Sequence, residues 1–535
     1  MPSVLTRHTV YHPRGIGRTC PGQEPKPRAP KYTVVESLKL EVVVVRRMLL
    51  LVLALALGAA AAVPASAQSA APPPRDQWHA SNDTGHWNNQ TRVRIDAACQ
   101  GLPEAEAVAC SLQAFKDKPF SVIALVDSGI NAYHQDFRAP DFIHHPSTYI
   151  EGYPASSKAL PLSFDVADTA GYDAARAADN TALAGIKSAE LRWIPGTRII
   201  GGISLSAGGN ASGKTERRIL DEDSHGTGTS SVAAGALYGA NPNALIVMIE
   251  GLGKASVDWA ANQPWIDMVS NSWGPGLPGR VDPLTSVDTW REATRRGQTV
   301  LFSAGNGMYN TNSSSVFPAG SDPCNCKIPT HNLTPTSYTS GPSFVVTIGA
   351  VSPINGQAHW WHGIPVDAAS FGSKWAAADA FAVAANTKRD FGGTSCATPI
   401  TAGVLSAVIE RARIELGDTT SGQAGGIVAQ AAPCATLPSN GPLADGTLTR
   451  IEAENLVLNS AQPVPFDAQK FQWDFAVEPT TEAYYVQQGY GVVDRAAKAR
   501  ALAALLGQQP LAARPQVDQW MQATDAVRDA IYGPG

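Results

Sequence analysis

The chain has 535 residues, of which 44% are hydrophobic and 16% charged, as in a globular protein of one large domain or a few smaller ones. Its net charge is −5, and beyond residue 67 the 32 basic and 43 acidic residues give a net charge of −11. Because an acidic chain lacks the basic footprint of nucleic-acid-binding proteins, no nucleic acid is expected as a partner.

The N-terminus has the three parts of a secretory signal peptide. Arg46 and Arg47 precede an apolar run over residues 48–63, and a small-residue cleavage pattern ends at Ala67. The run is shorter than the ~20 residues of a membrane span, and no second long apolar run follows. We therefore assign residues 1–67 to a leader, with residues 1–45 upstream of the true start. We expect a secreted, extracellular protein without a membrane anchor in its mature chain.

The cysteines that follow the leader permit disulfide bonds in an exported chain. They are Cys99, Cys110, Cys324, Cys326, Cys396 and Cys434. Cys99 and Cys110 form a plausible local pair, and either Cys324 or Cys326 is a candidate partner of Cys434. The pairing stays open. A zinc site is a weak alternative, because no second cysteine or histidine pair has ligand spacing.

Residues 68–95 are polar and rich in proline, which indicates an arm or linker. Beyond residue 96, short apolar runs alternate with helical patterns, which favours an α/β fold: a mostly parallel central sheet with helices on both faces. The expected strands are 121–126, 244–249, 299–303 and 344–350, and the expected helices are 226–237, 284–296 and 397–416. Residues 155–218 and 417–485 are interpreted as two long insertions, the second with a helix at 449–458. Residues 506–535 are expected to form a C-terminal helical tail.

Three segments carry residue types suited to nucleophilic catalysis. Asp127 ends an apolar strand, where α/β sheets place their sites. His225 opens a helix of small residues, and Ser395 opens another, whose N-terminal dipole favours developing negative charge. Each alone is as well explained as a turn or cap residue. Together they form the order Asp-His-Ser of one known arrangement of the serine triad.

The sequence around these residues resembles the subtilisin-like serine proteases, or subtilases. The matching motifs are "VDSGI" at 126–130, "HGTGTSSVAAG" at 225–235, "MVSNSWG" at 268–274, "VLFSAGNG" at 300–307, "VFPAG" at 316–320, "GTSCATP" at 393–399 and "GYGVVD" at 489–494. The resemblance implies a subtilisin-like catalytic domain over residues 96–505. An α/β-hydrolase is excluded, because its nucleophile motif and its triad order differ.

The resemblance also implies roles for single residues. Ser395 would be the nucleophile, His225 the general base and Asp127 the group that orients His225. Asn306 would donate its side-chain amide to the oxyanion. The substrate-binding segments would be Ser272, Trp273, Gly274, Ala304 and Gly305. Trp273 could narrow the specificity pocket or point into the core.

The chain departs from the family pattern at several positions. Gly228 replaces a second histidine of the helix motif. Asp136 stands where relatives have a calcium ligand, but the partner loop is short, so calcium is weakly supported and no cofactor is expected to be required. No metal site is assigned. His144, His145 and the "HWWH" stretch at 359–362 are interpreted as surface residues, and Cys396 as a buried filler.

These features predict a secreted, monomeric serine endopeptidase that hydrolyses polypeptides through an acyl-enzyme on Ser395. The alternative is a relative of narrow specificity, for processing or partner binding, whose cleft is restricted by the insertions.

Overall fold

The computed structural model describes residues 119–139, 142–160, 162, 175, 178–179, 189–205, 219–221, 223–273, 293, 296–306, 346–351, 366–373, 375–380, 388–418, 428–430, 441–462 and 488–511. All of them belong to the second of two compact units, Ala71–Gly535. The predicted leader, the N-terminal arm and every cysteine except Cys396 lie outside the described residues, as do most of the helix expected at 284–296 and the "HWWH" stretch.

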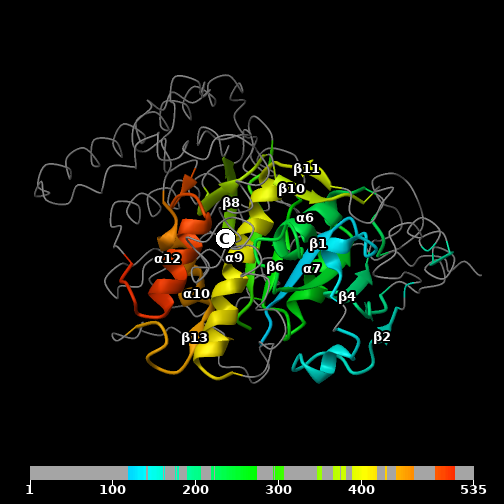
Figure 1. Cartoon of the computed structure of the whole chain (residues 1–535), viewed down its shortest axis with the longest axis horizontal. Coiled ribbons are helices and arrows are strands. Elements are labelled where there is room, and N and C mark those ends of the chain that lie inside the picture. Colours follow the sequence, from blue (N-terminus) through cyan, green and yellow to red (C-terminus); the bar gives the residue numbers. More distant parts are fainter. Residues whose placement is uncertain are drawn as a thin grey trace, which may run out of the picture. The chain divides into compact units, whose positions relative to one another are not determined.

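A nine-stranded sheet forms the centre of the described part, with the order β2-β3-β4-β5-β1-β6-β7-β8-β9 (Figure 1). Its strands are β1 (Val122–Asp127), β2 (Lys158–Ala159), β3 (Arg192–Trp193), β4 (Ile199–Ser204), β5 (Leu245–Glu250), β6 (Met268–Asn271), β7 (Thr299–Ser303), β8 (Val346–Val351) and β9 (Ala368–Phe371). Every pairing is parallel except that of β3 with β4. Two small sheets pair β10 (Trp375–Ala378) with β11 (Lys388–Phe391) and β12 (Val428–Gln430) with β13 (Leu448–Thr449).

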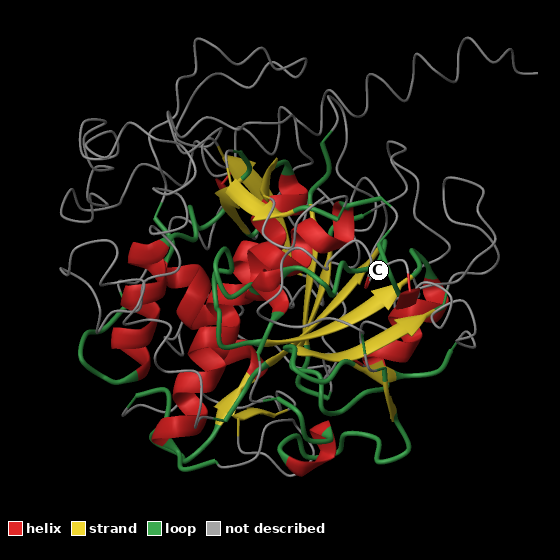
Figure 2. Cartoon of the chain, turned by 45° about the vertical axis from the view of Figure 1, so that its right-hand side comes forward, coloured by secondary structure: helices red, strands yellow, loops and turns green. Residues whose placement is uncertain are grey.

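The larger helices gather on one side of the twisted strands (Figure 2). The helices are α6 (His225–Ala234), α7 (Lys254–Ala261), α9 (Thr394–Glu415), α10 (Arg450–Ser460) and α12 (Arg495–Leu505). Local capping defines some of their starts: Thr449 and Glu452 form a capping box at α10, and the Asp494 side chain accepts from the N–H of Ala497 at α12. None of the described helices combines the length and apolar character that a membrane span needs.

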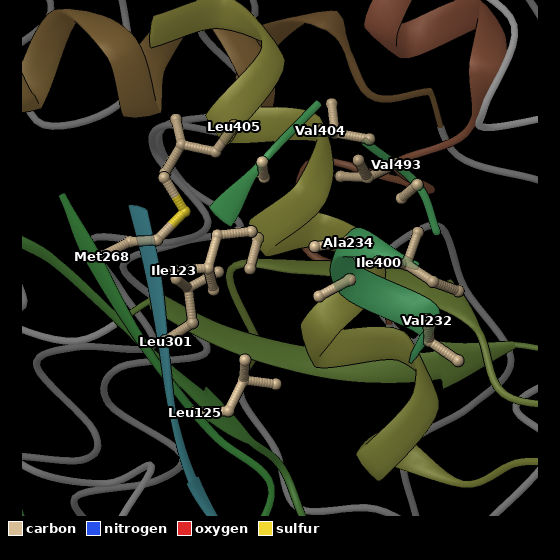
Figure 3. Packing of buried hydrophobic residues seen from close by; sticks show 14 of the residues in the cluster. Ile123, Leu125, Val232, Ala234, Met268, Leu301, Ile400, Val404, Leu405 and Val493 are labelled. Carbon is tan, nitrogen blue, oxygen red and sulfur yellow. The ribbon is translucent and has the colours of Figure 1, made fainter. Parts of the chain in front are cut away.

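Both faces of the sheet are buried, so its strands are apolar without alternation. Ile123 and Leu125 of β1 pack in the same hydrophobic cluster as Ile400 and Val404 of α9 (Figure 3). The intervening β1 residues join a second cluster on the other face, which includes Trp265 and Ala260 of helix α7. This arrangement confirms the predicted mostly parallel sheet with helices on both faces.

The predicted insertion at 155–218 is wrong where β2, β3 and β4 pair within the central sheet. Ile199–Ser204 is the fully buried strand β4, which pairs with β5 inside the central sheet. Its two central residues are Gly201 and Gly202, which weaken the apolar signal and made the segment look irregular. Within the interval 417–485 the expected helix is confirmed as α10. At the C-terminus, the described start of the predicted tail, residues 506–511, is a turn after α12 rather than helix.

The side on which successive strands are added to the sheet reverses at β1. The chain first adds β4 and β5 on one side of β1 and then adds β6 to β9 on its other side. Sites in such sheets lie beyond the carboxyl ends of the strands at this switch point. Asp127 is the last residue of β1 and pairs in register with Glu250 of β5, so it lies at that point.

Candidate active site

Asp127 and His225 form a hydrogen-bonded pair at the switch point. The Nδ1 atom of His225 lies 2.9 Å from Oδ1 and 3.1 Å from Oδ2 of Asp127, a carboxylate that is only 3% exposed. The Ser128 N–H and the Thr229 hydroxyl also donate to it, at 2.7 and 3.1 Å. Because an ionised carboxylate only accepts hydrogen bonds, it keeps the proton on Nδ1 and leaves Nε2 free to accept.

The surroundings of His225 favour its protonated form. Burial alone would lower the pKa of His225, but the charge of Asp127, the hydrogen bond to it, and the charges of Asp223 and Asp221 outweigh burial. Together they raise the pKa of His225 to about 9. The ring is 34% exposed and is therefore open to solvent on part of its surface.

An aromatic ring from β11 supports the imidazole. Phe391 packs edge-on against His225 with ring centroids 5.5 Å apart, and the guanidinium of Arg389 lies 6.0 Å from the Phe391 centroid. A Cβ atom at Gly228 would lie 2.6 Å from two ring carbons of Phe391. The glycine that departs from the family pattern is thus explained by the space that the Phe391 ring occupies.

We expect Gly228→Ala to destabilise the fold by about 1–3 kcal/mol, because overpacking against Phe391 outweighs the ~1 kcal/mol that alanine gains over glycine in a helix. The double variant with Phe391→Leu should recover part of this loss, since the smaller side chain makes room. Urea unfolding of the wild type, both single variants and the double variant measures this coupling. Additive effects would contradict the contact.

Ser395 lies at the start of α9, which packs against α6 (Figure 1). Its hydroxyl donates to the carbonyl of Ser272 at 3.3 Å, and the Ser272 hydroxyl donates back to the Ser395 carbonyl at 3.3 Å. Pro399 explains the second bond: it has no N–H to donate to the carbonyl four residues before it. Among the described hydrogen bonds, the Ser395 hydroxyl therefore contacts Ser272 and not His225.

Asn306 is fixed beside the same helix start. Its Oδ1 accepts from the N–H and the hydroxyl of Thr394, at 2.9 and 3.0 Å. These two donors define which end of the amide faces the helix, so Nδ2 is the end left to donate elsewhere. Gly393 has φ +75° and a Cβ there would lie 2.9 Å from Asn306 Oδ1, so this glycine is required by the asparagine as well as by its backbone conformation.

The predicted substrate-binding residues follow the ends of β6 and β7. Ser272 and Trp273 come directly after β6, and Ala304 and Gly305 come directly after β7, while Gly274 lies outside the described residues. Trp273 packs edge-on against Phe302, with ring centroids 5.7 Å apart. It also packs against two hydrophobic clusters, the one that contains Trp265 and a smaller one that contains Phe302. Sequence alone allowed Trp273 either to narrow the specificity pocket or to point into the core, and in the structure it points into the core.

Asp136 does not fit a calcium ligand in this chain. Its Oδ1 accepts from the N–H groups of Leu237 and Tyr238, at 2.6 and 3.2 Å, and its Oδ2 accepts from the Ser231 hydroxyl at 2.5 Å. The fully buried carboxylate thus holds the end of α6. The described residues contain no group of three or more His, Cys, Asp or Glu side chains that could hold a metal ion.

Two other sequence predictions concern residues near the core. Cys396 is fully buried in the main hydrophobic cluster, as a filler would be. His145 is engaged by its own loop, with Nδ1 2.8 Å from the Ser147 hydroxyl and Nε2 3.2 Å from the Ser157 carbonyl. Sequence reasoning missed Thr394 and Phe391, although Thr394 lies inside the "GTSCATP" motif and Phe391 stands two residues before it, where a polar or aromatic side chain is a visible signal.

The subtilase family model matches residues 121–432, more than half of the chain. The chain therefore belongs to the subtilase family and is a serine peptidase, whose substrates are polypeptides. No curated protein matches the chain.

Solved structures of similar fold include two proteases. Prenylagaramide maturation protease PagA is 12% identical with a TM-score of 0.39, over 74% of this chain and 98% of that one. The epidermin leader peptide processing serine protease EpiP from Staphylococcus aureus is 15% identical with a TM-score of 0.38, over 76% of this chain and 79% of that one.

Proposed function

We propose that this serine peptidase is a secreted endopeptidase that cleaves polypeptides through an acyl-enzyme on Ser395. The observation that carries the proposal is the Asp127–His225 pair at the end of β1, next to helix α9, whose second residue is Ser395. Secretion is proposed from the leader pattern of residues 1–67.

In the proposed acylation step, the Ser395 oxygen attacks the scissile carbonyl carbon and its proton passes to Nε2 of His225. The hydroxyl must first turn from the Ser272 carbonyl toward His225, and such catalytic hydrogen bonds often tighten only when substrate is bound. As the tetrahedral intermediate collapses, Nε2 returns the proton to the leaving amine. Water then repeats the sequence on the acyl-enzyme, and Asp127 stabilises the imidazolium in both halves.

The oxyanion would accept hydrogen bonds from Nδ2 of Asn306 and from the Ser395 N–H, which donates to no acceptor among the described residues. Thr394 supports this role, because it holds Oδ1 and turns Nδ2 away from the helix.

We expect Asn306→Leu to lower kcat by about 10²–10³-fold with little change in KM, because the lost donor acts on charge that develops only in the transition state. Thr394→Val should give a smaller loss, since it removes the hydroxyl but keeps the N–H that orients Asn306. Steady-state kinetics on a fluorogenic peptide measure both. A loss confined to KM would rule out the oxyanion role.

The direct test of the proposed function is labelling with a fluorophosphonate, which reacts with an activated serine. Purified protein should be labelled, and mass mapping should place the adduct on the peptide that contains Ser395. Unfolded protein is the control and should not react. Folded protein that hydrolyses peptides without labelling at Ser395 would refute the proposed mechanism, and folded protein that does neither would refute the function.

A second candidate is a processing protease of narrow specificity. It is favoured by one contact: the Tyr133 hydroxyl, in the segment after β1, donates to Asp179 of the interval 155–218 at 3.0 Å. Part of that interval therefore contacts the segment that directly follows Asp127 at the end of β1. Comparable turnover of unfolded casein and of defined peptides would exclude this candidate.

A further inference from the structure

A second carboxylate, that of Asp221, lies close to the Asp127–His225 pair. Asp221 precedes His225 by four residues and is 2% exposed. Its Oδ1 accepts from the Ser128 hydroxyl at 2.9 Å and from the N–H groups of Asp223 and Ser224 at 2.9 and 2.8 Å. Its Oδ2 accepts from the N–H and the hydroxyl of Thr227, at 2.8 and 2.6 Å. All five groups are donors, the pattern expected around an ionised carboxylate.

These five bonds join the neighbours of both members of the pair. Ser128 follows Asp127 directly, and its hydroxyl also accepts from the N–H of Gly226 at 2.9 Å. Ser224 precedes His225 in a left-handed conformation, φ +76°, which a non-glycine residue adopts only when its surroundings hold it there. The end of β1 and the first turn of α6 are therefore connected through one side chain.

We propose that Asp221 is a positioning residue of this protease, whose carboxylate holds the end of β1 and the start of α6 so that Asp127 and His225 keep their contact. This inference rests on the proposed function. Among the described hydrogen bonds, the Asp221 carboxylate has none to the side chains of Ser395 or His225, and it acts through Ser128 and through the residues on either side of His225.

The charge of Asp221 adds a second, electrostatic effect. The charged side chains around His225 come from β1, from the segment before α6 and from the β10–β11 hairpin: Asp127, Asp221, Asp223, Asp379 and Arg389. Asp127, Asp223 and Asp221 all raise the pKa of His225 against the effect of burial. Burial raises the pKa of Asp221 itself, while its hydrogen bonds from Thr227 oppose that rise.

The test is the variant Asp221→Asn, measured as kcat/KM against pH. In this variant an amide N–H₂ group replaces one of the two carboxylate oxygens. It would face groups that are themselves donors, so the turn before α6 should shift. We expect kcat/KM on the high-pH plateau to fall by about 10–100-fold, the scale of a small misplacement of catalytic groups, with KM little changed. The rising limb of the profile should move to lower pH by about half a unit, because one negative charge is lost.

Asp223→Asn is the matched control. Asp223 is exposed and also favours protonation of His225, but its side chain makes no described hydrogen bond to this turn. It should move the rising limb in the same direction without lowering the plateau. An equal loss of plateau in both variants, or an unchanged plateau in Asp221→Asn, would overturn the positioning role.

If Asp221→Asn does not fold, Ser128→Ala decides the question, because it removes only the link from β1 to Asp221 and Gly226. A loss of roughly 3–10-fold with an unshifted limb is then expected, and wild-type kinetics would overturn the proposal. Failure of the proposed function would show differently, as wild-type protein that neither reacts with fluorophosphonate nor cleaves peptides.

Discussion

Ser395→Ala is expected to reduce kcat by about 10⁶-fold and to abolish labelling by fluorophosphonate, because no other group can form the acyl-enzyme. A residual rate above that of water is expected from the remaining oxyanion donors and from substrate binding. Cys396 cannot replace the serine. Its thiol is fully buried, which raises its pKa well above the usual range, so the reactive thiolate is not available.

The measurement is peptide hydrolysis by wild type and variant at matched concentration, with thermal unfolding as a check of the fold. Thr401→Val is a suitable control, because the one hydrogen bond of its hydroxyl to the described residues goes to the Ala397 carbonyl within the same helix α9. It should keep wild-type activity. Iodoacetamide should also leave the wild type active. If Ser395→Ala retained more than about one hundredth of the wild-type kcat, the assignment of the nucleophile would be wrong.

Local sequence was sufficient to predict the elements that carry the candidate site. The apolar run that ends at Asp127 is β1, and the helices expected to open at His225 and Ser395 do begin there or one residue earlier. Strands buried on both faces and helices of small residues leave a clear signal, because the same residues that define the element also define its packing. The family motifs then assigned roles to the polar residues at the element ends.

The contacts that tune the site were not predictable in the same way. Phe391 and Gly228 are far apart in the chain. The Phe391 ring excludes a side chain at position 228 only because the β10–β11 hairpin packs on α6. The sequence around Asp221 does not mark it as important, because its five donors come from the end of β1 and from a turn that forms only in the folded chain. Strand β4 was missed for a related reason: its glycines carry no hydrophobic signal, although the strand is central to the sheet.

The second large effect is expected for Asp127→Asn, which should lower kcat/KM by about 10⁴-fold at its optimum. An amide donates a hydrogen bond where the carboxylate accepted one, so the imidazole would take the tautomer with the proton on Nε2. That nitrogen could then no longer accept the Ser395 proton. Thr229→Val is the matched control, because it removes one hydrogen bond to Asp127 but keeps the charge, and a few-fold loss is expected.

The pH profile makes this prediction specific to the pair. General base catalysis needs the neutral imidazole, so kcat/KM of the wild type should rise with pH, reach its midpoint near the pKa of His225, about 9, and level off above it. Without the charge of Asp127, the largest of the influences that raise this pKa, the rising limb of the variant should move to lower pH. An unchanged limb would mean that the titrating group does not face Asp127.

The free energy of unfolding should depend on pH because the pKa of His225 is raised in the folded state. A histidine whose pKa is raised in the folded state stabilises the fold fully below its ordinary pKa of 6.5, and this contribution is lost as the pH rises through about 9. The part of the Tm difference between wild type and Asp127→Asn that comes from His225 should therefore be present at pH 6 and shrink between pH 6.5 and 9. Thermal unfolding across this range separates it from the loss of the other hydrogen bonds to Asp127, which should vary little with pH there.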